Sequence, residues 1–242
     1  MSCYVKTLLT FFAVLMPALC GAQAADTFQP ALDSIEQRVK PCSECHGKEG
    51  RATREGYYPR IAGKPAGYLF NQLLNFRDGR RNYPMMVYLA DLQDETYLRE
   101  MAAYFGAQRA PYPPPSPPKV SSVVLERGRL LVMEGDAARH LPSCRSCHGA
   151  RLLGVAPDVP GLLGVSRDYL VAQLGAWHNG TRTAQAPDCM AEIVRRMGPD
   201  DVNAVTAWLA AQAVPEGAEA DSAFEHPPVL KCGSLPSTER AP

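Results

Sequence analysis

The chain has 242 residues, with 25 lysines and arginines balanced by 25 acidic residues, so its formal net charge at pH 7 is zero. This balance excludes a nucleic-acid-binding surface, which would show a strong basic excess. The length is sufficient for two small domains.

The first 24 residues have the form of a secretory signal peptide. Lys6 is the only charged residue before Asp26, residues 8–19 form an apolar run, and Ala22-Gln23-Ala24 presents small residues to a signal peptidase. The run is short for a membrane span, so an uncleaved anchor is the weaker alternative. Cys20 raises a lipoprotein alternative, but the residues before it match a lipidation signal poorly. We expect an exported protein cleaved near Ala24, with a mature net charge of 24 − 25 = −1.

Helical periodicity predicts three helices in the first half of the mature chain. Apolar residues recur at helical spacing over 30–41 and again over 65–76, where Pro65 suits a first helical position. A third helix is expected to begin at Asp94-Glu95, with an apolar face that continues to Phe105. The intervening segments 47–64 and 78–84 are expected to be loops.

The first of these helices leads into Cys42-Ser43-Glu44-Cys45-His46, and the same pattern returns as Cys144-Arg145-Ser146-Cys147-His148. Two cysteines three residues apart lie on one face of a helical turn, so both sulfurs can form thioethers with the vinyl groups of one haem. The adjacent histidine can then turn its imidazole to the iron. Two copies, each followed by glycine, predict two covalently bound haem c groups.

Two alternatives exist for these cysteines. One zinc ion could bind both pairs, but the pairs are about a hundred residues apart, far beyond zinc-ribbon spacing, and zinc does not require the histidines. A thioredoxin-like redox pair needs a strand–helix–strand context, which the sequence around Cys42 does not show. Haem attachment is therefore the stronger interpretation.

Residues 111–118, Pro-Tyr-Pro-Pro-Pro-Ser-Pro-Pro, are incompatible with a helix or a central strand. At about 3.1 Å per residue, a polyproline II spacer of this length spans roughly 25 Å. A proline-rich ligand for a partner protein is the alternative. We interpret 111–120 as a stiff linker between an N-terminal domain, 25–110, and a C-terminal domain, 121–214.

Between residues 59 and 81 of the first domain, the second domain repeats the first at one offset of 101 residues. The matched positions are Pro59 and Pro160, Gly63 and Gly164, Tyr68 and Tyr169, Gln72 and Gln173, Phe76 and Trp177, Gly79 and Gly180, and Arg81 and Arg182. Helices are again expected before the second cysteine motif and from Pro199. The chain is thus expected to be two copies of one all-α unit, followed by a polar tail, 215–242, without a core of its own. In units this small, a largely apolar haem would supply the missing core.

The proximal iron ligands are predicted to be His46 and His148. Each copy also has a methionine in the expected loop before its closing helix, Met85 in the first and Met190 in the second. The two lie at the same distance before that helix, and this spacing favours Met85 over Met86. A methionine sulfur as the sixth ligand occupies the last coordination position of the haem iron and raises its reduction potential. A free sixth position permits oxygen or peroxide chemistry.

Several further residues carry less specific signals. Pro59 and Pro160 follow the proximal histidines by 13 and 12 residues, so their carbonyls could accept the second imidazole N–H. Arg81 and Arg182 could pair with haem propionates, and the alternative is two solvated surface arginines. Three histidines are rival ligands that we interpret as surface residues: His140, His178 and His226.

These motifs together resemble the dihaem cytochrome c4 family over nearly all of residues 30–212. The resemblance implies an all-α fold of two tandem class I cytochrome c domains with a pseudo-twofold relation, joined by the Pro-rich linker. It implies a periplasmic electron shuttle with redox protein partners, a donor dehydrogenase or quinol-oxidising complex and an acceptor such as a haem-copper oxidase, and peripheral membrane association. Carried over to this chain, the axial pairs are His46 with Met85 and His148 with Met190.

The sequence departs from the family pattern near the second methionine and in the tail. Cys189 directly precedes Met190, and the tail beyond residue 214 is longer than expected. Cys189 and Cys232 are the only unassigned cysteines of the exported chain, so in an oxidising compartment we expect a disulfide that fixes the tail over the Met190 segment. Two free or intermolecularly paired thiols are the alternative.

Electron transfer without chemistry at the iron is the expected function, because both iron sites have a candidate methionine. The protein is accordingly predicted not to be an enzyme. One alternative is a dihaem enzyme of the peroxidase or thiosulfate-oxidising type, with a displaceable sixth ligand and an acid/base group beside it. Another is a cytochrome subunit permanently bound in a dehydrogenase complex. The departures from the family pattern favour a specialised relative, for instance an electron acceptor for one particular dehydrogenase.

Overall fold

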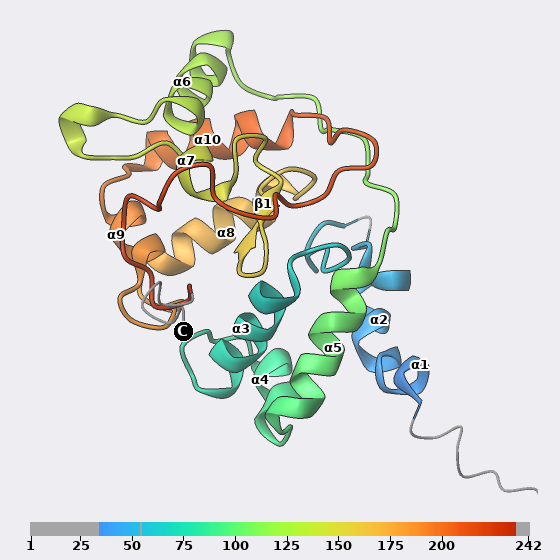
Figure 1. Ribbon diagram of the computed structural model, residues 1–242. Helices are drawn as coiled ribbons and strands as arrows, with labels where there is room; N and C mark the ends of the chain where they lie inside the picture. Colours follow the sequence, from blue (N-terminus) through green and yellow to red (C-terminus); the bar gives the residue numbers. More distant parts are fainter. Residues whose placement is uncertain (1–33, 54, 236–242) are drawn as a thin grey trace, which may run out of the picture.

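The computed structural model describes residues 34–53 and 55–235 (Figure 1). The predicted signal peptide, 1–24, and the beginning of the expected helix 30–41 lie outside the described residues. In the described part the chain forms two mostly helical halves, which Figure 1 shows one above the other with the linker along one side. None of the helices there has the length and apolar character that a membrane span requires.

The N-terminal half contains five α-helices and one turn of 3₁₀-helix within the described residues. They are α1 (Ile35–Arg38), α2 (Lys40–His46), η1 (Lys48–Gly50), α3 (Ala66–Arg77), α4 (Pro84–Asp91) and α5 (Glu95–Ala107). The helix expected over 30–41 is instead divided at Val39, because Pro41 stands in the first turn of the new helix α2. Helix α3 packs against both α4 and α5, and α1 contacts α5.

The C-terminal half repeats this order and adds a small hairpin. Its elements are α6 (Ser122–Met133), η2 (Ala137–Arg139), α7 (Arg145–His148), β1 (Gly154–Val155), β2 (Val159–Pro160), α8 (Arg167–His178), α9 (Cys189–Arg195) and α10 (Pro199–Ala210). Helices α3 and α8 are related by the offset of 101 residues, so the repeat predicted from the sequence is also a structural repeat. The strands pair antiparallel and are too short to give a sequence signal.

Side-chain caps define where several helices begin. Asp94 accepts a hydrogen bond from the Tyr97 N–H at the start of α5, and Asp188 accepts one from the Ala191 N–H at the start of α9. Together with Pro84 at the start of α4, the Asp188 cap explains why both methionine segments are helical. The expectation that these methionines lie in loops before the closing helices was wrong.

Each half has its own apolar core. In the N-terminal half the buried cluster is Val39, Leu69, Phe70, Leu98, Met101, Ala102 and Phe105. In the C-terminal half it is Leu131, Val132, Leu141, Leu152, Leu153, Leu163, Met197, Val205 and Leu209. Helices α6 and α10 cross closely in the second core, where a Cβ on Gly128 would lie 2.2 Å from the Ala204 carbonyl oxygen.

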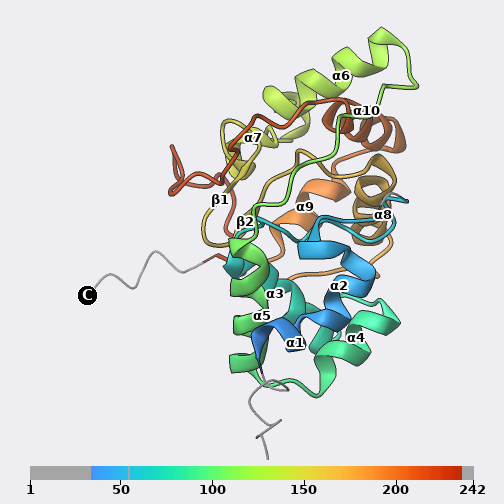
Figure 2. The same ribbon diagram turned by 90° about the vertical axis from the view of Figure 1, so that its right-hand side faces the viewer.

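The linker and the tail both run over the second half. Residues 111–120 contain neither helix nor strand, and the Ser116 N–H donates to the Ala210 carbonyl at 3.1 Å. The tail passes beside β1, where the Asp221 N–H donates to the Gly154 carbonyl at 2.9 Å (Figure 2). The tail has no helix within its described residues, as expected, but it is docked on the C-terminal half rather than separate from it.

Candidate haem sites

One cavity of about 790 Å³ extends across both halves and is lined by both cysteine motifs. His46 and His148 line it, and so do Met85, Met86 and Met190. All eight residues predicted from the sequence as haem-attachment or iron-binding positions therefore face one continuous space. Cys42, Cys45, Cys144 and Cys147 are free of disulfides and half-buried.

Each proximal histidine is held by one proline carbonyl. His46 is the last residue of α2, and its Nδ1 lies 2.8 Å from the Pro59 carbonyl oxygen. His148 ends α7, and its Nδ1 lies 2.8 Å from the Pro160 carbonyl oxygen. These contacts confirm the carbonyl partners expected from the sequence. With Nδ1–H donating to the carbonyl, the imidazole presents Nε2 as the nitrogen for a metal.

The glycine after each histidine is required by the backbone. Gly47 has φ +76° and Gly149 has φ +85°, values that residues with side chains rarely adopt. A Cβ on Gly47 would also lie 2.6 Å from the Ala52 carbonyl oxygen. The chain thus turns away immediately after the imidazole, which explains the glycine at the sixth position of the Cys-x-x-Cys-His-Gly pattern.

Burial keeps the proximal imidazoles neutral. His46 and His148 are each 8% exposed, and burial lowers the pKa of both, although the proline carbonyls oppose this shift. Nearby cations lower the pKa further, Arg81 for His46 and Lys64 for His148. A neutral imidazole is the form that binds a metal. Burial also raises the pKa of the Cys144 thiol to about 12.

The two candidate methionines occupy the same place in matching helices. Met85 is the second residue of α4, and Met190 is the second residue of α9. Met86 also lines the cavity but has no counterpart of this kind. The two positions differ in exposure, because Met85 is 52% exposed whereas Met190 is half-buried.

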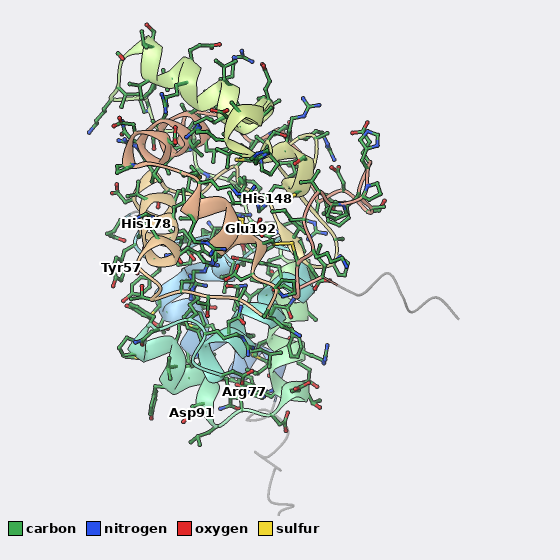
Figure 3. The ribbon with its side chains drawn as sticks, turned by 90° about the vertical axis from the view of Figure 1, so that its left-hand side faces the viewer. Tyr57, Arg77, Asp91, His148, His178 and Glu192 are labelled. Carbon is green, nitrogen blue, oxygen red and sulfur yellow. A yellow bond between two sulfur atoms is a disulfide. The ribbon has the colours of Figure 1, made fainter. Side chains whose placement is uncertain are left out.

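The rival histidines lie elsewhere. His140, His178 and His226 are exposed, and none of them lines the cavity. Figure 3 shows His178 at the edge of the molecule, whereas His148 lies inside. The interpretation of these three residues as surface histidines is confirmed.

An arginine pair marks the contact between the halves. Arg81 and Arg182 form an antiparallel backbone bridge and exchange partners across it. Arg81 donates to Gln173 Oε1 at 2.7 Å, and Arg182 donates to Gln72 Oε1 at 2.9 Å. Arg182 is 5% exposed, so the alternative of two solvated surface arginines was wrong. The reciprocal bonds place the pseudo-twofold relation between these residues.

Two further cations line the same cavity as this pair and break the repeat. Arg60 and Lys64 are 5% and 6% exposed, line the same cavity, and correspond by the offset of 101 to Gly161 and Val165. Lys64 Nζ donates to the Gly161 carbonyl at 2.7 Å. Arg60 donates to the carbonyls of Ala62, Ala110 and Pro111. Neither residue was predicted from the sequence. Their only signal is that the corresponding positions of the second copy carry no charge.

Four cations line the cavity, and the charge that they need bears on whether the cavity suits haem. Among the described residues no carboxylate forms an ion pair with Arg60, Lys64, Arg81 or Arg182, whose partners there are carbonyl, amide and phenol oxygens. Buried charges need counter-charges. Two haems bring four propionates, and the cavity also offers two thiol pairs, two neutral imidazoles and two methionine sulfurs. The residues therefore fit two haem c groups, and each iron when bound supplies one-electron transfer.

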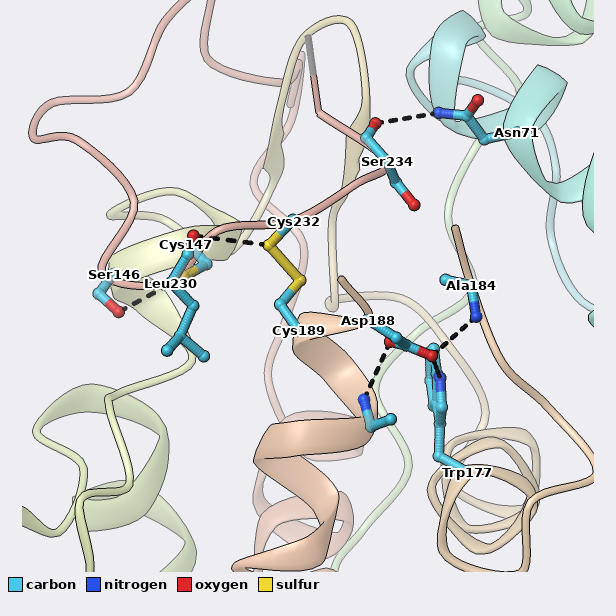
Figure 4. The surroundings of a disulfide bond; sticks show 11 residues. Asn71, Ser146, Cys147, Trp177, Ala184, Asp188, Cys189, Leu230, Cys232 and Ser234 are labelled. Carbon is cyan, nitrogen blue, oxygen red and sulfur yellow. Dashed lines mark hydrogen bonds between the residues drawn. A yellow bond between two sulfur atoms is a disulfide. The ribbon is translucent and has the colours of Figure 1, made fainter. Parts of the chain in front are cut away.

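The tail closes the second site from outside. Cys189 and Cys232 form the expected disulfide, with Cα atoms 5.1 Å apart (Figure 4). Phe224, Pro228 and Leu230 of the tail line the cavity beside Met190. Asn71 of α3 donates to the Ser234 carbonyl at 3.2 Å, so the tail also contacts the first half. No disulfide ties the tail to the first site within the described residues.

The alternative of one zinc ion bound by both cysteine pairs is not supported by the described residues. The described residues contain no group of three or more His, Cys, Asp or Glu side chains placed to hold one ion. The two cysteine pairs belong to different halves, so they are not placed to share one zinc ion. Two helical units, each with a Cys-x-x-Cys-His motif and a methionine on one cavity, define the class of tandem c-type cytochromes.

Comparison with known proteins identifies the family. No family model matches the chain. The thiosulfate dehydrogenase electron acceptor of Thiomonas intermedia is 35% identical over 171 residues, 71% of this chain and 78% of that protein. The cytochrome c4 structure from Acidithiobacillus ferrooxidans has a TM-score of 0.60 and 29% identity, covering 72% of this chain and 99% of that chain.

A third similar protein is the thiosulfate dehydrogenase TsdBA from Marichromatium purpuratum, with a TM-score of 0.63 and 32% identity. It covers 70% of this chain, and this chain spans about a third (36%) of its length. The chain belongs to the dihaem cytochrome c4 family. It is a dihaem c-type cytochrome with two covalently bound haem c groups, and it functions in electron transfer.

Proposed function

We propose that this cytochrome is a periplasmic carrier that takes single electrons from a thiosulfate-oxidising dehydrogenase and passes them to a terminal acceptor such as a haem-copper oxidase. The similar protein from Thiomonas intermedia is named for the first of these roles. The similarity to one part of the longer TsdBA chain supports the same donor. The predicted export signal supports the periplasmic location.

We assign the haem attachment to Cys42 and Cys45 in the first domain and to Cys144 and Cys147 in the second. His46 with Met85 and His148 with Met190 are the axial pairs. The proposed domain limits are 25–110 and 121–214, with the linker at 111–120. The observation that carries the ligand assignment is the identical helix position of Met85 and Met190 on the cavity that both proximal imidazoles face.

Two methionine-closed irons leave no position for a substrate, so the protein itself is proposed not to be an enzyme. Thiosulfate oxidation would need a displaceable sixth ligand, and the exposure of Met85 is the one feature that would favour it. The test is to mix the oxidised protein with thiosulfate alone and then with thiosulfate and a thiosulfate dehydrogenase. Rapid reduction only with the dehydrogenase supports a carrier, and reduction by thiosulfate alone would contradict it.

The ligand assignment is tested by Met85→Ala with Met86→Ala as the matched control. Methionine coordination of ferric haem gives a weak absorption band at the red end of the spectrum. Met85→Ala is expected to lose half of that intensity, to lower one reduction potential, and to bind carbon monoxide at one haem. Met86→Ala should retain the full band, and the opposite result would transfer the role to Met86.

A further inference from the structure

Lys64 is a buried cation that crosses from the first half into the second. It lies just before α3 and is 6% exposed, and its Nζ donates to the Gly161 carbonyl at 2.7 Å. Among the described residues no carboxylate forms an ion pair with it. An ammonium in this position retains much of its field, because little water is present to screen it.

The acceptor of Lys64 belongs to the backbone that holds the second proximal histidine. Gly161 directly follows Pro160, whose carbonyl accepts the His148 imidazole at 2.8 Å. Lys64 lines the cavity together with His148, and its charge lowers the pKa of that imidazole. The corresponding charge at His46 is Arg81, whose guanidinium is shared between the halves through Gln72 and Gln173.

The repeat shows that Lys64 has no charged counterpart in the second half. Arg81 and Arg182 are matched by the pseudo-twofold relation, and each donates to the equivalent glutamine of the other half. The counterpart of Lys64 is Val165, so no lysine crosses in the opposite direction. Arg60 is also unmatched, but its guanidinium bonds the linker carbonyls and lies 3.8 Å from the Tyr112 ring centroid.

We propose that Lys64 of the first domain raises the reduction potential of the second haem site relative to the first, so that a single electron on the protein resides mainly in the C-terminal domain. Reduction adds one negative charge to the iron, and a nearby buried cation favours that state. The step moves one electron from the reduced first site to the oxidised second site and needs no other reactant. The inference rests on the proposed ligand set.

The test is a redox titration of the two-haem protein carrying Lys64→Met, Lys64→Gln or Lys64→Arg. NMR signals of the ligand methionine methyl groups assign each potential to its site. The electron partition is the ratio of molecules reduced at the second site to molecules reduced at the first. In Lys64→Met this ratio should fall about tenfold, which for one electron is a change of about 59 mV in the difference between the two potentials. Lys64→Gln keeps a donor for the Gly161 carbonyl but lacks the charge, and should behave like Lys64→Met. Lys64→Arg keeps the positive charge, so its electron partition should stay close to that of the wild type.

Val165→Met is the control at the mirrored position, and it should leave the partition unchanged because it alters no charge. Equal changes at both sites, or a wild-type partition in Lys64→Gln, would overturn the proposal. Haem content and the ferric red band, measured on the same samples, report on the ligand set separately. A variant with both bands intact and an unchanged partition therefore contradicts the role of Lys64 and leaves the proposed function standing.

Discussion

At the scale of single residues, the structure separates groups that hold the haem sites from groups that hold the fold. The 2.8 Å contacts of His46 and His148 with proline carbonyls belong to the first kind. Asp201 belongs to the second. Its carboxylate is 1% exposed at the start of α10, and it accepts hydrogen bonds from Arg127, Arg139 and the Gly198 N–H.

We predict that Asp201→Asn destabilises the C-terminal domain by about 1.5–3 kcal/mol, because charge-assisted hydrogen bonds from two partly exposed arginines to a buried carboxylate are lost. Urea unfolding of the oxidised protein, followed by the absorption of the second site, measures the loss. Asp200→Asn is the matched control, since Asp200 is the exposed neighbour in the same helix turn. A loss below about 1 kcal/mol in Asp201→Asn, or an equal loss in both variants, would show that the network contributes little.

The same carboxylate should make stability depend on pH. Burial alone would raise the pKa of Asp201, but the hydrogen bonds from Arg139, Arg127 and Gly198 outweigh it and lower the pKa. A carboxyl with a lowered folded-state pKa stabilises the fold above its unfolded pKa of about 3.9 and loses that contribution as pH falls through the folded value. The difference between wild type and Asp201→Asn should therefore be constant near pH 6 and shrink below about pH 4.

At the scale of elements, the long helices that both halves share were predicted from the sequence. The short helices and the features found in one half only were not. The 3.6-residue periodicity located α3, α5, α6 and α10, because each buries apolar residues along one face, and α8 followed from its match with α3 in the repeat. Helices α4 and α9 were taken as loops, since seven or eight residues give little periodicity. Lys64 was not predicted, because its only signal is a position where the two copies differ, whereas the repeat is defined by the positions where they agree.

The crossing of α6 and α10 depends on Gly128. A Cβ there would approach the Ala204 carbonyl oxygen to 2.2 Å, so Gly128→Ala should destabilise the C-terminal domain by about 1–3 kcal/mol or more. Gly175→Ala in α8 is the control, because nothing lies within 4 Å of its Cβ and helix propensity should give a gain of about 0.5–1 kcal/mol. Thermal unfolding of both variants checks this, and equal effects would contradict the close crossing.

The disulfide between α9 and the tail should stabilise the second site. Its cysteines are 43 residues apart, and loop-closure entropy predicts a loss of about 4 kcal/mol in the Cys189→Ser/Cys232→Ser variant. The tail residues that line the cavity would be released, so the red band of the second site should disappear at a lower urea concentration. The first site, to which no disulfide ties the tail within the described residues, serves as the internal control. Two alkylatable thiols in the native wild type would contradict the bridge.

At the scale of the whole molecule, two similar domains become unequal where they meet. The pseudo-twofold relation of Arg81 and Arg182 alone would give two equivalent sites. In our proposal Lys64 adds a charge at the second site, and the disulfide fixes the tail to the helix that carries Met190 of the same site. The more exposed methionine is Met85, at the first site. These differences are consistent with electron exchange at the first domain and electron storage in the second.

This inequality requires the close contact of the domains, which Gly67 permits. A Cβ on Gly67 would lie 2.3 Å from Asp158 Oδ1 and 2.8 Å from the Pro157 carbonyl oxygen, so Gly67→Val should force the interface apart. Ala66→Val is the control, because Ala66 is exposed and adjacent. Gly67→Val should keep both ferric red bands and two haems per chain. Its radius of gyration in solution scattering should rise, and its electron partition should approach that of Lys64→Met, because the ammonium leaves the second site with its domain. An unchanged partition in a visibly opened molecule would mean that each domain sets its own potential.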